Sequence, residues 1–82
     1  MPHKQTYGRM ADVLLCLANR IYKTNSFDLE LSRKELAELA GMSVESTTRI
    51  LTKFKSEGLI RITGKNIEIL DDPRLFEISQ KG

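Results

Sequence analysis

The stretch LSRKELAELAGMSVESTTRIL, residues 31–51, contains two helix starts separated by one tight turn. Ser32 opens the first helix, because a serine followed three residues later by a glutamate, here Glu35, forms a capping box. Gly41 ends that helix, since glycine adopts the left-handed backbone conformation without steric cost. Ser43 opens a second helix directly after this turn. The stretch therefore predicts a helix-turn-helix unit.

Apolar residues in both helices predict the faces that point toward the core. In the first helix, the expected inner stripe consists of Leu36, Leu39 and Ala40. The second helix is predicted from about residue 44 to residue 57, and its core positions recur at three- and four-residue steps: Thr47, Ile50, Leu51 and Phe54. The positions expected to face outward on this helix are Val44, Glu45, Thr48 and Arg49.

The sequence before this unit predicts one further helix and a strand. An amphipathic helix is expected over residues 6–22, with an apolar side formed by Met10, Val13, Leu14, Leu17, Ala18 and Ile21. Cys16 is assigned to that same side and is expected to be buried as a small hydrophobic residue. Residues 27–31 alternate between apolar and acidic side chains, which predicts a short half-buried strand.

The sequence after the unit predicts a β-hairpin. Two strand-like runs, residues 59–62 and 66–70, flank Gly64–Lys65, and residues 74–79 are expected to add a short last turn of helix. A hairpin in this place turns the helix-turn-helix unit into a winged one. The predicted fold class is mainly α with a small β-hairpin (α+β), a winged helix-turn-helix with a three-helix core plus a wing. It occupies residues 1–82 as one domain.

Positive charge is concentrated in the middle of the chain. Residues 33–65 carry seven basic and four acidic side chains, whereas residues 1–32 carry four and three, and residues 66–82 carry two and four. A local basic surplus is the electrostatic footprint of nucleic-acid binding, although solvated protein surfaces also carry such patches.

Enzyme, metal and membrane signatures are missing from the sequence. It has one cysteine, Cys16, one histidine, His3, and no catalytic or phosphate-binding motif. No apolar run approaches the ~18 residues of a membrane span, and no signal-peptide pattern opens the chain. We therefore expect a cytoplasmic protein that is not an enzyme and whose chain holds no catalytic residue, metal or cofactor.

The outward residues of the second helix suit two different uses. Arginine can donate two hydrogen bonds to O6 and N7 of guanine, and glutamate can accept one from N4 of cytosine. Val44 and Thr48 offer methyl groups that can contact the methyl group of thymine. However, Glu45 and Arg49 are four residues apart, which is also the spacing of a surface ion pair on a helix. Spacing alone supports base reading and ion pairing equally.

A family resemblance adds to these residues. Residues 31–51, with Glu57-Gly-Leu-Ile60 and Gly64-Lys65, resemble the C-terminal domain of the Crp/Fnr transcription regulators, and the likeness extends over roughly residues 8–80. It implies binding of double-stranded DNA, with Glu45 and Arg49 reading bases. It also implies phosphate contacts by Ser32, Arg33, Ser43, Ser46 and Lys65. We add Lys53 to the phosphate candidates for its charge and its place on the second helix.

The resemblance also points to parts and partners beyond this chain. Family members are homodimers with an N-terminal sensor domain and a dimerisation helix, both expected to be absent here, so the effector is unknown and the fragment is expected to be monomeric. RNA polymerase is a further partner that the family implies. The cyclic-AMP branch has an arginine where this chain has Val44, so the pattern is nearer the fumarate–nitrate branch, which implies a half-site nearer TTGA than TGTGA.

A winged helix used as a protein-interaction module is the alternative function. It predicts an apolar or acidic outer face on the second helix. The sequence instead has Glu45, Thr48, Arg49 and Lys53 there, which suits DNA better.

Overall fold

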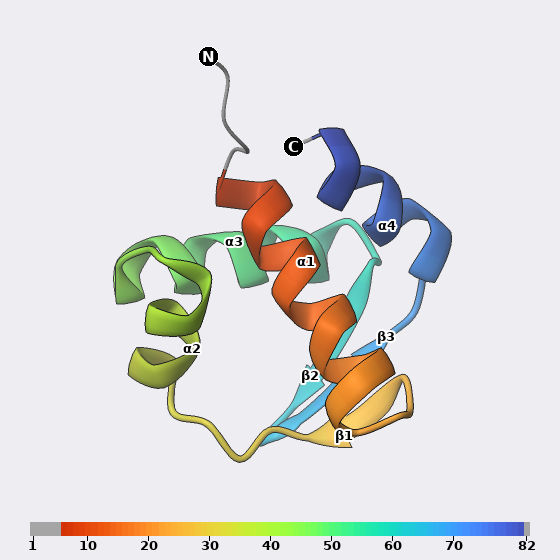
Figure 1. Ribbon diagram of the computed structural model, residues 1–82, viewed down its shortest axis with the longest axis horizontal. Coiled ribbons are helices and arrows are strands. Elements are labelled where there is room, and N and C mark those ends of the chain that lie inside the picture. The colour runs from red at the N-terminus through yellow and green to blue at the C-terminus, as the bar shows by residue number, and fades with distance from the viewer. Residues whose placement is uncertain (1–5, 82) are drawn as a thin grey trace.

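Helices pack against one face of a small sheet in the computed structural model, which describes residues 6–81. The elements in chain order are α1 (Thr6–Cys16), η1 (Leu17–Ile21), β1 (Ser26–Asp28), α2 (Arg33–Ala40), α3 (Val44–Ser56), β2 (Ile60–Thr63), β3 (Asn66–Ile69) and α4 (Asp72–Lys81). Figure 1 shows α1 crossing the front of the molecule, with α3 behind it and α4 beside it. His3 lies outside the described residues.

The three strands form one antiparallel sheet in the order β1-β3-β2. Phe27 of β1 and Ile62 of β2 both pair with Ile67 of β3, so one row of large side chains lines a single face of the sheet. The predicted hairpin is confirmed, and the strand predicted over residues 27–31 joins it as a third strand. That strand is shorter than expected, because beyond Asp28 only Leu29 still bonds to the hairpin, at Lys65 O.

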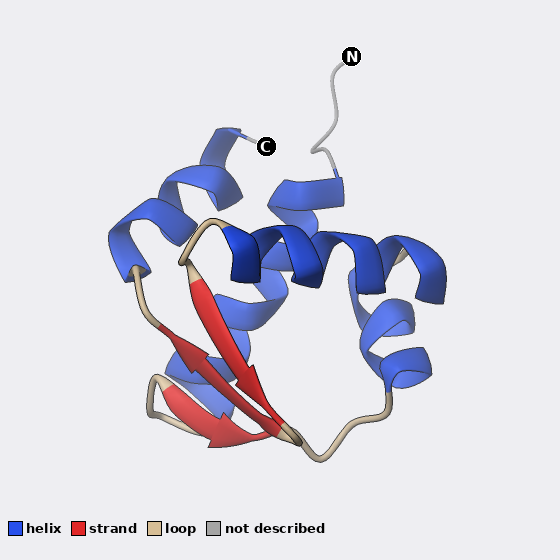
Figure 2. Ribbon diagram, turned by 180° about the vertical axis from the view of Figure 1, so that it is seen from behind, coloured by secondary structure: helices blue, strands red, loops and turns tan. Residues whose placement is uncertain are grey.

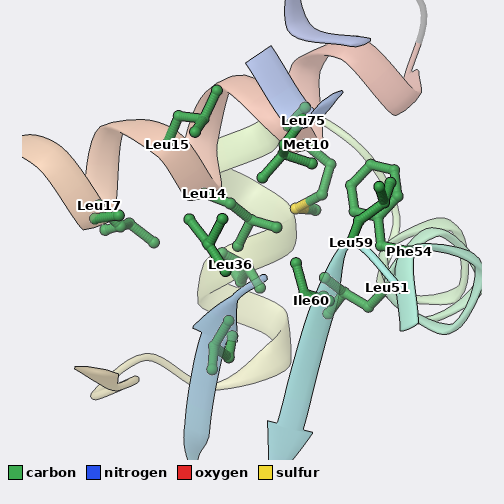
Figure 3. Packing of buried hydrophobic residues seen from close by; sticks show 14 of the residues in the cluster. Met10, Leu14, Leu15, Leu17, Leu36, Leu51, Phe54, Leu59, Ile60 and Leu75 are labelled. Carbon is green, nitrogen blue, oxygen red and sulfur yellow. The ribbon is translucent and has the colours of Figure 1, made fainter. Parts of the chain in front are cut away.

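One hydrophobic core joins the helices to this sheet. Figure 3 shows side chains from α1, α2, α3 and α4 converging above β2. Met10, Leu14, Leu36 and Leu75 are fully buried, and Phe54 and Leu59 are nearly so. The helical residues among them lie on the apolar stripes of α1, α2, α3 and α4, and Leu59 lies in the turn between α3 and β2, so the core holds α3 against the rest of the domain.

The helix predicted over residues 6–22 is present, but its last turn is a π-helix, η1, and two of its residues are not where the sequence analysis placed them. The buried residues of α1 are Gly8, Met10, Ala11, Leu14 and Leu15. At about 100° per residue, Cys16 lies on the opposite side of the helix, so its predicted burial is wrong. Ile21 is 64% exposed, because the wider final turn rotates it away from the core.

Two other expectations change, one in α2 and one at the C-terminal end of the fold. Leu39 is 57% exposed, since α2 turns Leu36, Ala37 and Ala40 inward and Leu39 lies at the edge of that stripe. The short turn expected over residues 74–79 is a ten-residue helix, α4, whose start is capped by the Asp71 carboxylate accepting from Arg74 N at 3.1 Å. The winged helix-turn-helix is thus confirmed, with the three predicted strands in one sheet and with the expected last turn extended into a packed helix.

Candidate nucleic-acid interface

Local hydrogen bonds at α2 and α3 produce the helix-turn-helix unit. Ser32 Oγ accepts from Glu35 N at 3.1 Å, and the Glu35 carboxylate accepts from Ser32 N at 2.9 Å, which completes the predicted capping box. Gly41 has φ 72°, the left-handed conformation that ends α2. Ser43 Oγ then accepts from Ser46 N at 3.0 Å and starts α3. Only residues 41–43 therefore separate the two helices.

The core residues of α3 determine which of its side chains face outward. Thr47, Ile50, Leu51 and Phe54 are all buried, as the sequence predicted. Glu45 and Arg49 lie on the opposite side of the helix and are exposed, with Val44 and Thr48 exposed beside them. Thr52 is also exposed on this side, one turn after Thr48. Sequence reasoning missed Thr52, although the same helical spacing that identifies Arg49 also selects it.

Glu45 and Arg49 do not form the surface ion pair that their spacing allows. Among the interactions of residues 6–81, none joins these two side chains. Instead, Arg49 Nη2 donates to Ser46 Oγ at 3.5 Å, a long and weak contact. Both charged groups are therefore accessible to a ligand on the outer face of α3.

Two of the serine candidates for phosphate contact already accept capping hydrogen bonds. A serine hydroxyl that accepts at a helix start still has its O–H to donate, so Ser32 and Ser43 keep a donor for a phosphate oxygen. Both lie at helix N-termini, which favour anions. Ser46 and Arg33 are half-buried, whereas Lys53 is exposed and pairs with Glu57 at 3.3 Å. Such an exposed pair is weak, so Lys53 can exchange Glu57 for a phosphate at little cost.

The wing lies next to the start of α2. Gly64, with φ 60°, turns the β2–β3 hairpin, and exposed Lys65 follows it at the tip. Leu29 N donates to Lys65 O at 2.8 Å, which ties the tip to the segment leading into Ser32. Figure 2 shows α3 running across the near face of the molecule, with the hairpin below one of its ends and α2 at the other. The candidate residues thus come from three adjacent elements.

Within residues 6–81, no group of three or more histidine, cysteine, aspartate or glutamate side chains is arranged to hold a metal ion. No helix in that part of the chain is long and apolar enough to cross a membrane.

Comparisons with known proteins agree with this architecture. The Crp-like helix-turn-helix domain model matches residues 8–78. The transcriptional regulatory protein btr of Bordetella pertussis is 34% identical over 74 residues, covering 85% of this chain and 31% of that protein. The CRP-like cAMP-activated global transcriptional regulator of Mycobacterium tuberculosis is 38% identical over 72 residues, covering 83% and 32%. The crystal structure of the Thermus thermophilus catabolite activator protein matches with a TM-score of 0.80 at 31% identity, covering 92% of this chain and 34% of that one.

The two capped helices, the tight turn and the wing define a winged helix-turn-helix DNA-binding domain. The chain belongs to the Crp-like helix-turn-helix domain family, and the relatives named above are transcription regulators. It spans about a third of the length of these relatives.

Proposed function

We propose that this chain binds double-stranded DNA sequence-specifically by inserting α3 into the major groove. The single observation that carries this proposal is the outer face of α3, where Glu45 and Arg49 are exposed side by side without pairing to each other. The major groove, about 12 Å wide, admits one α-helix, and the first turns of a recognition helix reach the base edges. The proposed activity is transcription regulation without catalysis, and it needs no cofactor in this domain.

The proposed roles follow from the chemistry of each group. Arg49 donates two hydrogen bonds to O6 and N7 of guanine, Glu45 accepts from N4 of cytosine, and Thr48 and Val44 contact thymine methyl groups. Phosphates are held by Ser32 and Arg33 at the start of α2, by Ser43 and Ser46 at the start of α3, by Lys53 and by Lys65 at the wing tip. These phosphate contacts position the domain, whereas the base contacts carry the sequence information.

We further propose that Val44 makes the preferred half-site nearer TTGA than TGTGA. An arginine at this position would add a second guanine-reading group, and valine has no donor with which to contact guanine O6 or N7. The half-site is therefore expected to lack an invariant guanine at its second position.

For the whole protein, we propose a homodimeric regulator that uses two such domains on adjacent half-sites. The relatives are about three times as long as this chain, which supports additional sensing and dimerisation parts. RNA polymerase is the proposed protein partner, and the cytoplasm, where bacterial DNA lies, is the proposed location. The effector that such a sensor would bind is not specified by any residue of this domain.

A titration of the isotope-labelled chain with duplex DNA tests the proposal by NMR. We expect amide signals to shift in the first two turns of α3, at Ser32–Arg33 and at Gly64–Lys65, and signals of Cys16 and Phe76 to stay in place. Shifts confined to α1 and α4, or no shifts at all, would contradict DNA binding through α3. A protein-interaction module, the alternative function, predicts that second result.

A further inference from the structure

Arg9 of α1 reaches across to the turn between α2 and α3. Its Nε donates to the carbonyl oxygen of Ala40 at 3.1 Å, and its Nη2 donates to the carbonyl oxygen of Gly41 at 3.4 Å. Ala40 is the last residue of α2, and Gly41 is the left-handed residue that ends it. One guanidinium group thus binds the Ala40 carbonyl and, through a longer and weaker contact, the following Gly41 carbonyl, over sequence separations of 31 and 32 residues.

The end of α2 needs a group of this kind. The last carbonyl groups of a helix accept no hydrogen bond from an N–H group of the same helix, and they carry partial negative charge. Gly41 N and Met42 N satisfy the carbonyls of Glu38 and Ala37, but α2 has no basic side chain in its own last turn. Arg9 supplies that positive charge from another helix, and hydrogen bonds from a charged donor are stronger than neutral ones.

The position of this turn determines where α3 begins. Gly41 lies two residues before Ser43, the N-cap of α3, so fixing the Gly41 carbonyl restrains the first turn of the recognition helix. A second contact from α1 reaches the other half of α3, where the Tyr7 and Phe54 rings lie 6.2 Å apart at 43°. The first turns of α1 therefore contact the helix-turn-helix unit at the turn before α3 and again at Phe54, near the C-terminal end of α3.

We infer that Arg9 is a positioning residue for DNA reading, which orients α3 through the Ala40 and Gly41 carbonyls. This inference rests on the proposed function, because it concerns how accurately Glu45 and Arg49 meet the bases. A lysine does not reproduce the two-donor geometry of the guanidinium group, so Arg9→Lys should keep the charge at the end of α2 but lose part of the positioning.

The test compares Arg9→Met and Arg9→Lys with Arg20→Met. Arg20 is exposed on η1, about three turns away from Arg9, so its substitution removes the same charge without touching the turn. Affinity is measured for the DNA sequence that the unaltered chain enriches from a random pool and for a scrambled duplex, across salt concentrations, at a temperature where each variant is folded. We expect Arg9→Met to lower the ratio of the affinity for the enriched sequence to that for the scrambled duplex by at least about threefold. This is less than the discrimination that one bidentate base contact supplies. Arg9→Lys should lie between Arg9→Met and the unaltered chain, and Arg20→Met should have no effect.

Two results would overturn the inference. An equal loss on both duplexes, with the slope of log K against log salt lower by about 1, would make Arg9 a phosphate contact. An unchanged affinity ratio with a lower melting temperature would make its role purely structural.

A measurement without DNA separates this inference from the proposed function. Spin labels on Cys16 and on a Thr48→Cys variant report the distance between α1 and the first turns of α3. We expect Arg9→Met to broaden that distance distribution and Arg20→Met to leave it unchanged; equal distributions would contradict the inference. If the unaltered chain prefers no DNA sequence, the proposed function fails, and the spin-label distances alone decide whether Arg9 positions α3.

Discussion

At the scale of single residues, a few polar side chains of α3 matter most for ligand binding and for stability. Arg49 and Glu45 are exposed on α3 and unpaired with each other, so their hydrogen-bonding capacity is available to a ligand. On the buried side of the same helix, Thr47 is fully buried, and its Oγ1 has no hydrogen-bond partner. The exposed side of α3 thus has polar groups available for binding. The buried side lowers the stability of the fold, because a buried hydroxyl without a partner is destabilising.

Thr47→Val is expected to stabilise the domain by about 1 kcal/mol, because the substitution removes the unsatisfied hydroxyl and keeps the β-branched shape. Urea unfolding measures the change in the free energy of unfolding. The control is Thr52→Val, which lies exposed on the same helix and should change this free energy by less than about 0.5 kcal/mol. A destabilised Thr47→Val variant would mean that the hydroxyl has a partner in solution.

At the scale of elements, α4 contributes a stabilising surface that the sequence only hinted at. Leu75 is fully buried, and α4 packs along α1, whereas Phe76, the next residue, is 56% exposed. Helix α4 therefore extends the core beside α1 through Leu75. Its contribution to stability should come through Leu75 and not through its neighbour.

Leu75→Ala is expected to destabilise the domain by about 2–5 kcal/mol through the lost burial and the cavity it leaves. Phe76→Ala, the matched control, should change the free energy of unfolding by less than about 1 kcal/mol, because its ring is largely in solvent. Chemical denaturation of both variants checks this difference. Equal effects of the two substitutions would show that α4 does not dock on α1 in the way described.

The wing makes a prediction about electrostatics. Lys65→Ala should weaken binding to all DNA sequences alike and lower the slope of log K against log salt by about 1, because one phosphate contact is lost. Lys81→Ala removes the same charge from the end of α4 and should leave the slope unchanged. Salt titrations of DNA affinity measure both variants. A loss confined to one sequence would instead make Lys65 a base-reading residue.

Local sequence signals predicted the elements well, because caps and turns depend on residues only a few positions apart. Ser32 with Glu35, Gly41 and Ser43 all lie where the sequence placed them. Burial was less predictable at Cys16 and Leu39, since both are apolar but the packing of neighbouring elements decides which side of a helix is covered. The outward face of α3 followed from its core spacing.

The bond from Arg9 to Ala40 spans 31 residues and could not be read from either segment alone. The same holds for the full packing of α4, which exists because α1 offers an apolar surface far away in the sequence. Local patterns thus predicted the candidate site, and long-range contacts determine how it is held.

At the scale of the whole molecule, the domain is expected to act as a single unit that faces DNA with one side. We expect the 82-residue chain to be monomeric in dilute solution and to bind duplexes with one or two half-sites without cooperativity. A linked dimer would gain up to ~10²–10⁴-fold from joining two binding events, and this chain should show no such gain. Analytical ultracentrifugation and titrations of both duplexes measure this. A tight dimer, through exposed side chains such as Ile21 or Phe76, would contradict the expectation.

Helix α3 is proposed to read base sequence through Glu45 and Arg49. Glu45→Ala should keep or raise non-specific affinity while discrimination between DNA sequences falls, because the substitution also removes a charge that repels phosphates.

The most direct measurement of base reading by α3 is selection of binding sites from random duplex DNA with the unaltered chain and with Arg49→Ala. We predict an enriched half-site near TTGA for the unaltered chain. For Arg49→Ala, we predict lost preference at one base pair and a cost of about 1–3 kcal/mol on the preferred site. The same enriched sequence from both chains, or no enrichment by the unaltered chain, would contradict the claim.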